Sequence, residues 1–148
     1  MAFLSATCII CERVLRETDN VLSAIRIVNV FTVQPIPDIA IELQATPISI
    51  LGTIQFSPDD EANHSISLVM IRPDGEESEM PLTSEQVVPP SIFPEMPRAA
   101  VLLVQLGVLG KGFGVHKVVL KSDGVEVVRA QFLLKLALDV PVQNSLPS

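Results

Sequence analysis

Apolar and polar residues alternate along this chain in short runs that are separated by turn sequences. The apolar runs are rich in Val, Ile, Leu and Phe, and none carries a helical apolar stripe long enough for a helix. The turn sequences include Ser57-Pro58-Asp59-Asp60, Arg72-Pro73-Asp74-Gly75 and Lys121-Ser122-Asp123-Gly124. This rhythm predicts an all-β fold, an immunoglobulin-like antiparallel β-sandwich of about seven to nine strands with Greek-key connections.

The apolar runs define the predicted strands, which cover residues 5–15, 22–33, 48–56, 65–71, 78–82, 98–106, 113–121 and 125–138. The first two strands form a hairpin centred on Asp19, which places Glu12 opposite Arg26 and predicts an ion pair between them. The last two strands form a second hairpin, because Asp123-Gly124 favours a tight two-residue turn.

The remaining segments are connections. Residues 38–47 could form a short helical turn or an edge strand, and the Pro-rich segment 89–97 is predicted to cross between the sheets. We expect a single β-sandwich domain over residues 1–140, followed by a flexible tail at 141–148.

Composition and charge narrow the classes of ligand. Aromatic residues make up only 4% of the chain, with no Trp and no Tyr, so flat surfaces for stacking on sugars or bases are scarce. The net charge is −7, and residues 59–95 carry nine acids against a single base, Arg72. Because an acidic protein repels phosphates, we expect no nucleic-acid partner. The acidic segment itself is typical of solvated loops and an edge strand.

Membrane insertion is not predicted either. No apolar run approaches the roughly 18–20 residues that a membrane-spanning helix needs. The apolar start of the chain has no basic segment before it, and its apolar run ends at Cys11-Glu12-Arg13 without a cleavage motif. We therefore expect a cytoplasmic protein.

Cys8 and Cys11 have the spacing of redox and zinc motifs, but a strand places residues three apart on opposite faces. The two thiols are then roughly 10 Å apart along the strand, beyond the limit of about 7 Å for a disulfide. We predict two buried, reduced thiols. The glycine cluster at 107–114 leads into a strand rather than a helix, so it predicts a turn with positive φ and not a phosphate loop.

No constellation of residues predicts catalysis or metal binding. The acids Asp59, Asp60 and Asp74 flank one strand at opposite ends, which leaves each end short of calcium ligands. His64 and His116 stand in no recognisable pattern with an acid and a Ser. We therefore expect no catalytic, cofactor or metal residues, no cofactor and no enzymatic activity.

Two parts of the chain carry a resemblance to a known family. The first part consists of Cys-Glu-Arg-Val-Leu at 11–15, Asp19, and Ser-Ala-Ile-Arg-Ile-Val-Asn at 23–29. The second part consists of Arg-Pro-Asp-Gly at 72–75, Phe-Gly-Val-His at 113–116 and Leu-Lys-Ser-Asp-Gly at 120–124. These stretches resemble an uncharacterised bacterial family of immunoglobulin-like β-sandwich proteins. The resemblance implies such a sandwich in a bacterial cytoplasmic protein and transfers no site residues. The chain departs from it at residues 18–20, where a Gly is usual.

The functional expectation is a non-enzymatic protein-interaction or structural module. Open strand edges and a loop with Ile92, Phe93 and Met96 would contact a protein partner, unless these three side chains instead cap the core. The alternative is a carrier or sensor of a small apolar ligand held between the sheets. A homodimer is also expected, because several strands, including 5–15, are apolar on both faces.

Overall fold

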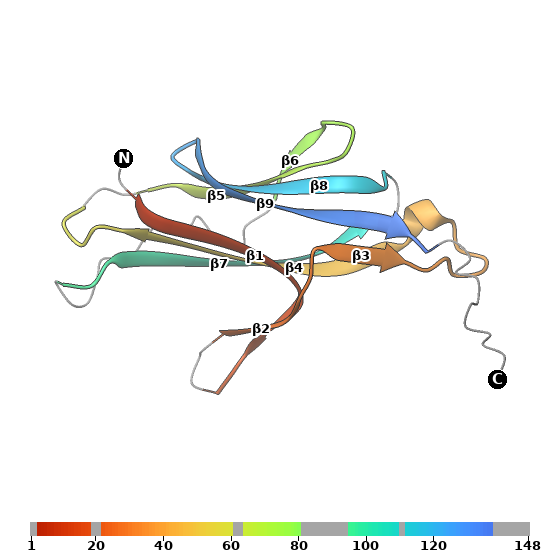
Figure 1. Cartoon of the computed structure of the whole chain (residues 1–148), viewed down its shortest axis with the longest axis horizontal. Coiled ribbons are helices and arrows are strands. Elements are labelled where there is room, and N and C mark those ends of the chain that lie inside the picture. The colour runs from red at the N-terminus through yellow and green to blue at the C-terminus, as the bar shows by residue number, and fades with distance from the viewer. Residues whose placement is uncertain (1–2, 19–21, 61–63, 81–94, 110–111, 138–148) are drawn as a thin grey trace, which may run out of the picture.

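The computed structural model describes residues 3–18, 22–60, 64–80, 95–109 and 112–137, which form two β-sheets packed face to face (Figure 1). The first sheet has the order β2 (Leu22–Ile27), β1 (Phe3–Arg16), β4 (Ala45–Phe56) and β7 (Arg98–Leu109). The second has the order β3 (Val30–Val33), β9 (Val125–Leu136), β8 (Gly114–Ser122), β5 (Ile66–Ile71) and β6 (Glu77–Glu79). The described residues contain a 3₁₀ turn, η1 (Ile41–Leu43), and no helix that is long and apolar enough to cross a membrane.

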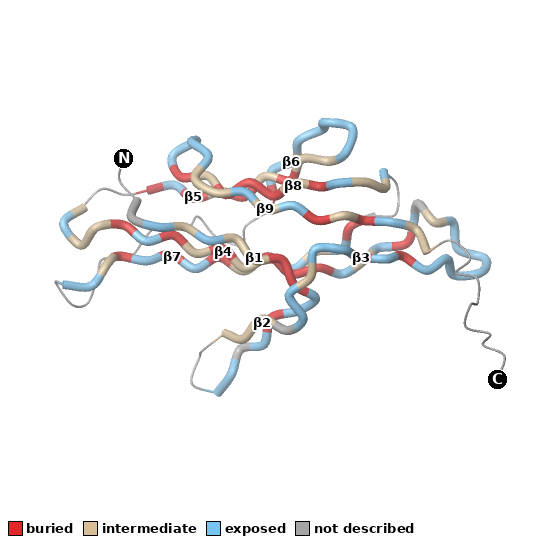
Figure 2. Tube along the Cα trace, in the orientation of Figure 1, coloured by how far each residue is buried: buried red, intermediate tan, exposed pale blue. Residues whose placement is uncertain are grey.

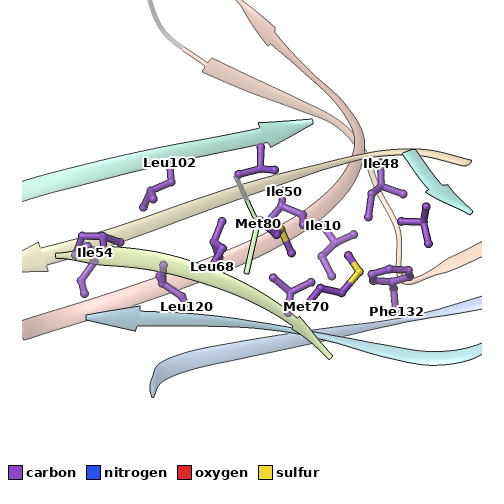
Figure 3. Close-up of a cluster of buried hydrophobic side chains, with 14 of the residues drawn as sticks. Ile10, Ile48, Ile50, Ile54, Leu68, Met70, Met80, Leu102, Leu120 and Phe132 are labelled. Carbon is purple, nitrogen blue, oxygen red and sulfur yellow. The ribbon is translucent and has the colours of Figure 1, made fainter. Parts of the chain in front are cut away.

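Aliphatic side chains from the inner faces of both sheets form the core. In Figure 3, Ile10, Ile50 and Leu102 of the first sheet point toward Leu68 and Leu120 of the second. All five are at most 5% exposed, and burying each such side chain contributes about 1.5–3 kcal/mol. The buried positions in Figure 2 follow these strands through the interior. The predicted all-β sandwich with an aliphatic core is confirmed.

The predicted strand 22–33 is in fact two strands that belong to different sheets. The chain leaves the first sheet after Ile27 and enters the second at Val30. The Val28 N–H still donates to the Ile10 carbonyl at 3.3 Å, while the Asn29 carbonyl already accepts from the Leu133 N–H at 2.8 Å. One continuous apolar run therefore serves both layers.

The sheet switch also changes the expected pairing. β3 pairs with β9 in the parallel sense, with Phe31 opposite Leu134, so the expectation of a wholly antiparallel sandwich is wrong. The physical reason is that the chain keeps its direction as it crosses, and it arrives beside β9 running the same way. The other strand pairs of both sheets are antiparallel.

The predicted turns are found where they lie within the described residues. Asp123 and Gly124 both have positive φ, 52° and 80°, as a tight two-residue hairpin requires. Of the two alternatives for residues 38–47, the short helical turn is found as η1; the strand that starts at Ala45 is β4, an interior strand of the first sheet and not an edge strand. Most of the Pro-rich segment 89–97 and the whole tail 141–148 lie outside the described residues.

The glycine cluster at 107–114 leads from β7 to β8, which belong to different sheets. Gly112 and Gly114 have positive φ, as predicted for this turn. Gly107 has a different role inside β7. Gly107 pairs with Pro47 of β4, two residues after Ala45. A Cβ at position 107 would lie 2.8 Å from the Ala45 Cβ. The close approach of β4 and β7 at this end therefore requires a residue without a side chain.

We expect Gly107→Ala to lower the free energy of unfolding by about 1–3 kcal/mol, because the added methyl overpacks the contact with Ala45. Urea denaturation measures the change. Gly52→Ala is the matched control on β4, since its Cβ would meet Leu120 at 3.7 Å, an ordinary contact. Adding Ala45→Gly to Gly107→Ala should recover part of the loss, and strict additivity of the two changes would contradict the explanation.

Candidate functional site

The β1–β2 hairpin turns away from the two layers (Figure 1). A groove with a volume of about 580 Å³ lies beside the hairpin. Four strands that diverge at the sheet switch provide its walls. The lining residues are Glu12, Arg13, Arg26, Val30, Phe31, Thr32, Thr46 and Pro47. The groove therefore exists because one strand pair turns away from the core while β3 continues along the second sheet.

The predicted ion pair between Glu12 and Arg26 is confirmed at the mouth of this groove. Arg26 Nε lies 3.1 Å from Glu12 Oε1, and the hairpin register pairs Cys11 with Ile27 and Arg13 with Ile25, as expected for a hairpin centred on Asp19. The Arg26 side chain is 69% exposed, so the pair contributes little to stability and leaves the guanidinium accessible.

Arg13 is exposed and also lines the groove, and no ion pair joins it to another residue that the structure describes. Thr32 of β3 and Thr46 of β4 also line the groove. Guanidinium groups bind phosphate and carboxylate oxygens through paired hydrogen bonds, and hydroxyl groups often complete such sites. The groove can therefore bind an oxyanion.

The acids of β6 and of the β4–β5 connection lie away from the groove walls, whereas Asp38 lies on the β3–β4 loop that joins two of these walls. Glu77 and Glu79 lie on β6, which is four strand spacings, about 20 Å, from β3 in the second sheet. Asp59 and Asp60 follow the far end of β4, about 40 Å along that strand from Ala45. The net charge of −7 therefore does not describe the local charge at the groove.

A buried histidine at that far end forms a second polar cluster, which sequence reasoning missed. His64 Nδ1 lies 2.6 Å from Asp123 Oδ2, and its Nε2 lies 2.8 Å from Asp60 Oδ2. The ring stacks on Phe56 with centroids 4.1 Å apart, and Arg98 donates to the Asp60 carbonyl. The cluster joins the β4–β5 connection to the β8–β9 turn.

The hydrogen bonds of this cluster favour the protonated form of His64. The hydrogen bond to Asp123, followed by that to Asp60, raises the pKa of His64 against the opposing effect of burial. The His64 hydrogen bond and the Ser65 N–H lower the pKa of the Asp123 carboxyl. With both ring nitrogens donating to carboxylates, the imidazolium has no lone pair to accept a proton or bind a metal.

His116 occupies a different environment. It is buried in the core, stacks on Phe132 with centroids 4.9 Å apart, and its Nδ1 lies 3.2 Å from the Gly114 carbonyl oxygen. Burial lowers the pKa of His116. It is a packed sheet residue, and the structure does not bring it together with His64.

The two cysteines lie on opposite faces of β1, as predicted, and no disulfide joins them. Cys11 is buried and its Sγ contacts the Ser49 carbonyl, whereas Cys8 is only partly buried, which corrects the expectation of two fully buried thiols. Desolvation raises the pKa of the Cys8 thiol to about 11, so it is protonated at neutral pH. No group of three or more potential metal ligands was found in the described part of the chain.

The predicted partner-contact loop is only partly described. Met96 is 54% exposed, just before β7, whereas Ile92 and Phe93 lie outside the described residues.

Comparisons with known proteins identify a fold. No family model and no curated protein matches the chain. Among solved structures, it is similar to Pseudomonas fluorescens alkylpurine DNA glycosylase AlkC bound to DNA containing an abasic site analog, with a TM-score of 0.50 and 10% sequence identity. The match covers 72% of this chain and 28% of that chain, so the matched part is about a quarter of that protein. At this identity the likeness shows the fold.

This comparison corrects three expectations. We expected a non-enzymatic interaction or structural module, or a carrier of an apolar ligand; we expected no enzyme; and we expected protein partners without nucleic acid. The solved protein with a similar fold is an enzyme bound to DNA, so these expectations are wrong.

The His64 cluster predicts a pH dependence of stability. Because the folded pKa of His64 is raised, its contribution is fully present below the unfolded pKa of about 6.5 and is lost as pH rises through the folded pKa. The lowered pKa of Asp123 adds stability above its unfolded pKa, which is lost only in acid. Urea denaturation should show that the free energy of unfolding declines as the pH rises through the folded pKa of His64. His64→Gln should abolish this decline and lower the free energy of unfolding at pH 6 by about 1–3 kcal/mol.

NMR titration provides the control, because the chain has two histidines. We expect the His64 ring to titrate above the ordinary histidine pKa and His116 below it, and Asp123→Asn to lower the pKa of His64 alone. Titration of His64 at the ordinary value would contradict the cluster.

Proposed function

We propose that this chain is the DNA-contacting β-sandwich of an enzyme that acts on DNA, and that its groove binds the sugar–phosphate backbone. The observation that carries the proposal is the convergence of Arg13, Arg26, Thr32 and Thr46 in one groove, remote from the acidic residues of β6 and of the β4–β5 connection. The similarity to a DNA-bound glycosylase supports the choice of DNA among oxyanions.

Backbone recognition suits the residues that line the groove. About half or more of the hydrogen bonds between proteins and DNA go to phosphate and sugar, from Arg, Thr and similar donors. Two arginines, Arg13 and Arg26, line the groove, and Phe31 forms part of its apolar lining. Contacts of this kind fix the position of a protein on DNA without reading its sequence.

The catalytic step of the proposed enzyme is not assigned to the His64 cluster, since both of its ring nitrogens are engaged. The matched region is about a quarter of the glycosylase chain, so the remaining length of that protein has no counterpart in the match. The β-sandwich's role in the proposed function is to hold DNA.

The fold and location can be proposed more finely. Two features support an immunoglobulin-like sandwich with Greek-key connections. Residues 22–33 are divided between the two sheets, and β7 and β8 lie in different sheets. Membership in the uncharacterised bacterial family of such proteins and a cytoplasmic location remain part of this proposal, and the two thiols without a disulfide fit a reducing compartment.

The double substitution Arg13→Ala and Arg26→Ala should weaken binding to a short labelled DNA duplex about tenfold at moderate salt, measured by fluorescence anisotropy. A plot of log affinity against log salt concentration should lose about two units of slope, because about 0.9 counterions are released per phosphate contact. Glu12→Gln should act in the opposite direction and strengthen binding, since it removes a carboxylate from the groove.

Arg129→Ala is the matched control. Arg129 is exposed and paired to Glu126 at 2.6 Å, like the pair in the groove, but it lies on β9 about six residues from the partner of Thr32. It should change affinity little. Absence of duplex binding by the wild-type chain at low salt, or equal losses for Arg129→Ala and the groove variant, would contradict the proposal.

A further inference from the structure

His64 joins two segments of the chain at one end of the sandwich. Its ring is 6% exposed, Nδ1 lies 2.6 Å from the Asp123 carboxylate in the β8–β9 turn, and Nε2 lies 2.8 Å from the Asp60 carboxylate in the β4–β5 connection. The ring holds both carboxylates only when each of its nitrogens carries a hydrogen. The link between the two segments therefore depends on the protonation state of one side chain.

The number of hydrogen-bond donors on the ring changes when His64 loses its proton. The imidazolium has two N–H donors, whereas the neutral imidazole has one N–H donor and one nitrogen with a lone pair. An ionised carboxylate can only accept. One of the two carboxylates then faces a nitrogen that has no hydrogen to give, and two acceptors in contact repel each other. Neutral His64 can therefore hold Asp60 or Asp123, but not both.

Three parts of the chain bring charged groups to the ring. Asp60 and Asp123 contact it directly, and Arg98 at the start of β7 donates to the Asp60 carbonyl. A further neighbour is Phe56, at the end of β4, which stacks on the ring and carries no charge. Glu61 follows Asp60 but lies outside the described residues. Among the described residues, the choice between the two neutral forms of the ring is thus a choice between two carboxylates.

Solvent exposure decides which carboxylate is released. The Asp123 side chain is 51% exposed, whereas that of Asp60 is 15% exposed. Water replaces a lost hydrogen bond at an exposed carboxylate, but a buried acceptor without a donor bears the full cost of desolvation. The bond to Asp123 is the shorter of the two, at 2.6 Å, but this shortness is typical of a charge-assisted bond, which the neutral ring cannot form. Neutral His64 therefore keeps its hydrogen on Nε2, toward Asp60.

Release of the Asp123 side chain affects Ser65 but not the strand pairing. The Asp123 carboxylate accepts from the Ser65 N–H through Oδ1 at 2.9 Å, and Ser65 is exposed, so water can take over this donor. The Asp123 N–H donates to the Ser65 carbonyl at 2.8 Å without using the side chain. Pairing of β5 with β8 begins at the next residue, with Ile66 opposite Ser122. The side-chain contacts can therefore open while the two strands stay paired.

We propose that His64 is a pH-dependent clasp: the imidazolium holds the β4–β5 connection to the β8–β9 turn, and the neutral ring keeps Asp60 and releases Asp123. The clasp opens as the pH rises through the folded pKa of His64, which lies above the ordinary histidine value. It differs from a loss of global stability, because the sandwich stays folded while one turn is released. It depends neither on the groove nor on the ligand of the groove. Since one proton leaves, this end of the sandwich also becomes more negative.

Amide hydrogen exchange tests where the clasp opens. We expect the protection factor of the Ser65 amide to fall about tenfold as His64 titrates, because its acceptor moves away. The Asp123 amide and the Leu120 amide in the middle of β8 should keep their protection factors. NMR measures all three, together with the His64 titration, on the whole chain. Equal losses at the three amides would show global opening and overturn the clasp, as would unchanged protection of Ser65.

The position of the remaining ring hydrogen tests which carboxylate is released. Above the midpoint of the His64 titration, the nitrogen chemical shifts of the ring should show a hydrogen on Nε2 and none on Nδ1. A hydrogen on Nδ1 would mean that Asp123 stays bound to the neutral ring, and this result would overturn the proposal.

Asp123→Asn should keep the clasp closed at high pH. The Asn side-chain oxygen can accept from the Ser65 N–H in place of Oδ1, and the Asn side-chain nitrogen replaces Oδ2 and donates to Nδ1 of the neutral ring. Asn also tolerates the φ of 52° at this position, so the turn is retained. We expect the protection of Ser65 in this variant to stay constant through the wild-type midpoint. A loss as large as that of the wild type would contradict the clasp.

Glu126→Gln is the matched control. Glu126 is an exposed carboxylate near the start of β9, and it pairs with Arg129 instead of the ring. The substitution removes the same negative charge from the same hairpin, so the Ser65 amide should still lose protection at the wild-type midpoint. Retained protection in this variant would assign the effect to the net charge of the hairpin and overturn the clasp.

Discussion

The passage of one apolar run from the first sheet to the second is the constraint on which the rest of the structure depends. Between Ile27 and Val30 the chain must leave one hydrogen-bonded ladder and join another, and Arg26 adopts a φ of 57° just before the crossing. A positive φ is unusual for a residue other than glycine and costs energy, which the surrounding strand pairing offsets. The β1–β2 hairpin diverges from the core as a result, and the groove lies in the space between the diverging strands.

The positions of most strands along the chain and the register of the first hairpin could be predicted from sequence, because both depend on local signals. A run of alternating apolar residues between turn residues specifies a strand, and a turn centred on Asp19 specifies that Glu12 faces Arg26. The division of residues 22–33 was not predicted, because Asn29 is the only polar residue at the crossing and single polar residues also occur within strands. Arg26 carries no mark of its positive φ, as a glycine would.

The polar clusters were harder to predict for a different reason. His64 and Asp123 are 59 residues apart in sequence, and only the folded topology brings the two turns together. The groove likewise draws residues from four strands, whereas the sequence supplied only the total charge and its division along the chain. The distribution of charge along the sequence does not give its distribution over the folded surface, because the fold brings together residues that are distant in sequence. Here β6 and β3 stand at opposite edges of one sheet.

β1 belongs to two structures at once. Its first part pairs with β4 inside the sandwich, its last part pairs with β2 outside it, and Cys11 takes part in both pairings. The Cys11 thiol also contacts the Ser49 carbonyl of β4. Beyond Cys11, β1 therefore has β2 as its hydrogen-bonded neighbour and no longer pairs with β4. The hairpin extends about 17 Å past this point, so one side of the groove is made by strands of the packed sandwich and the other by a two-stranded ribbon.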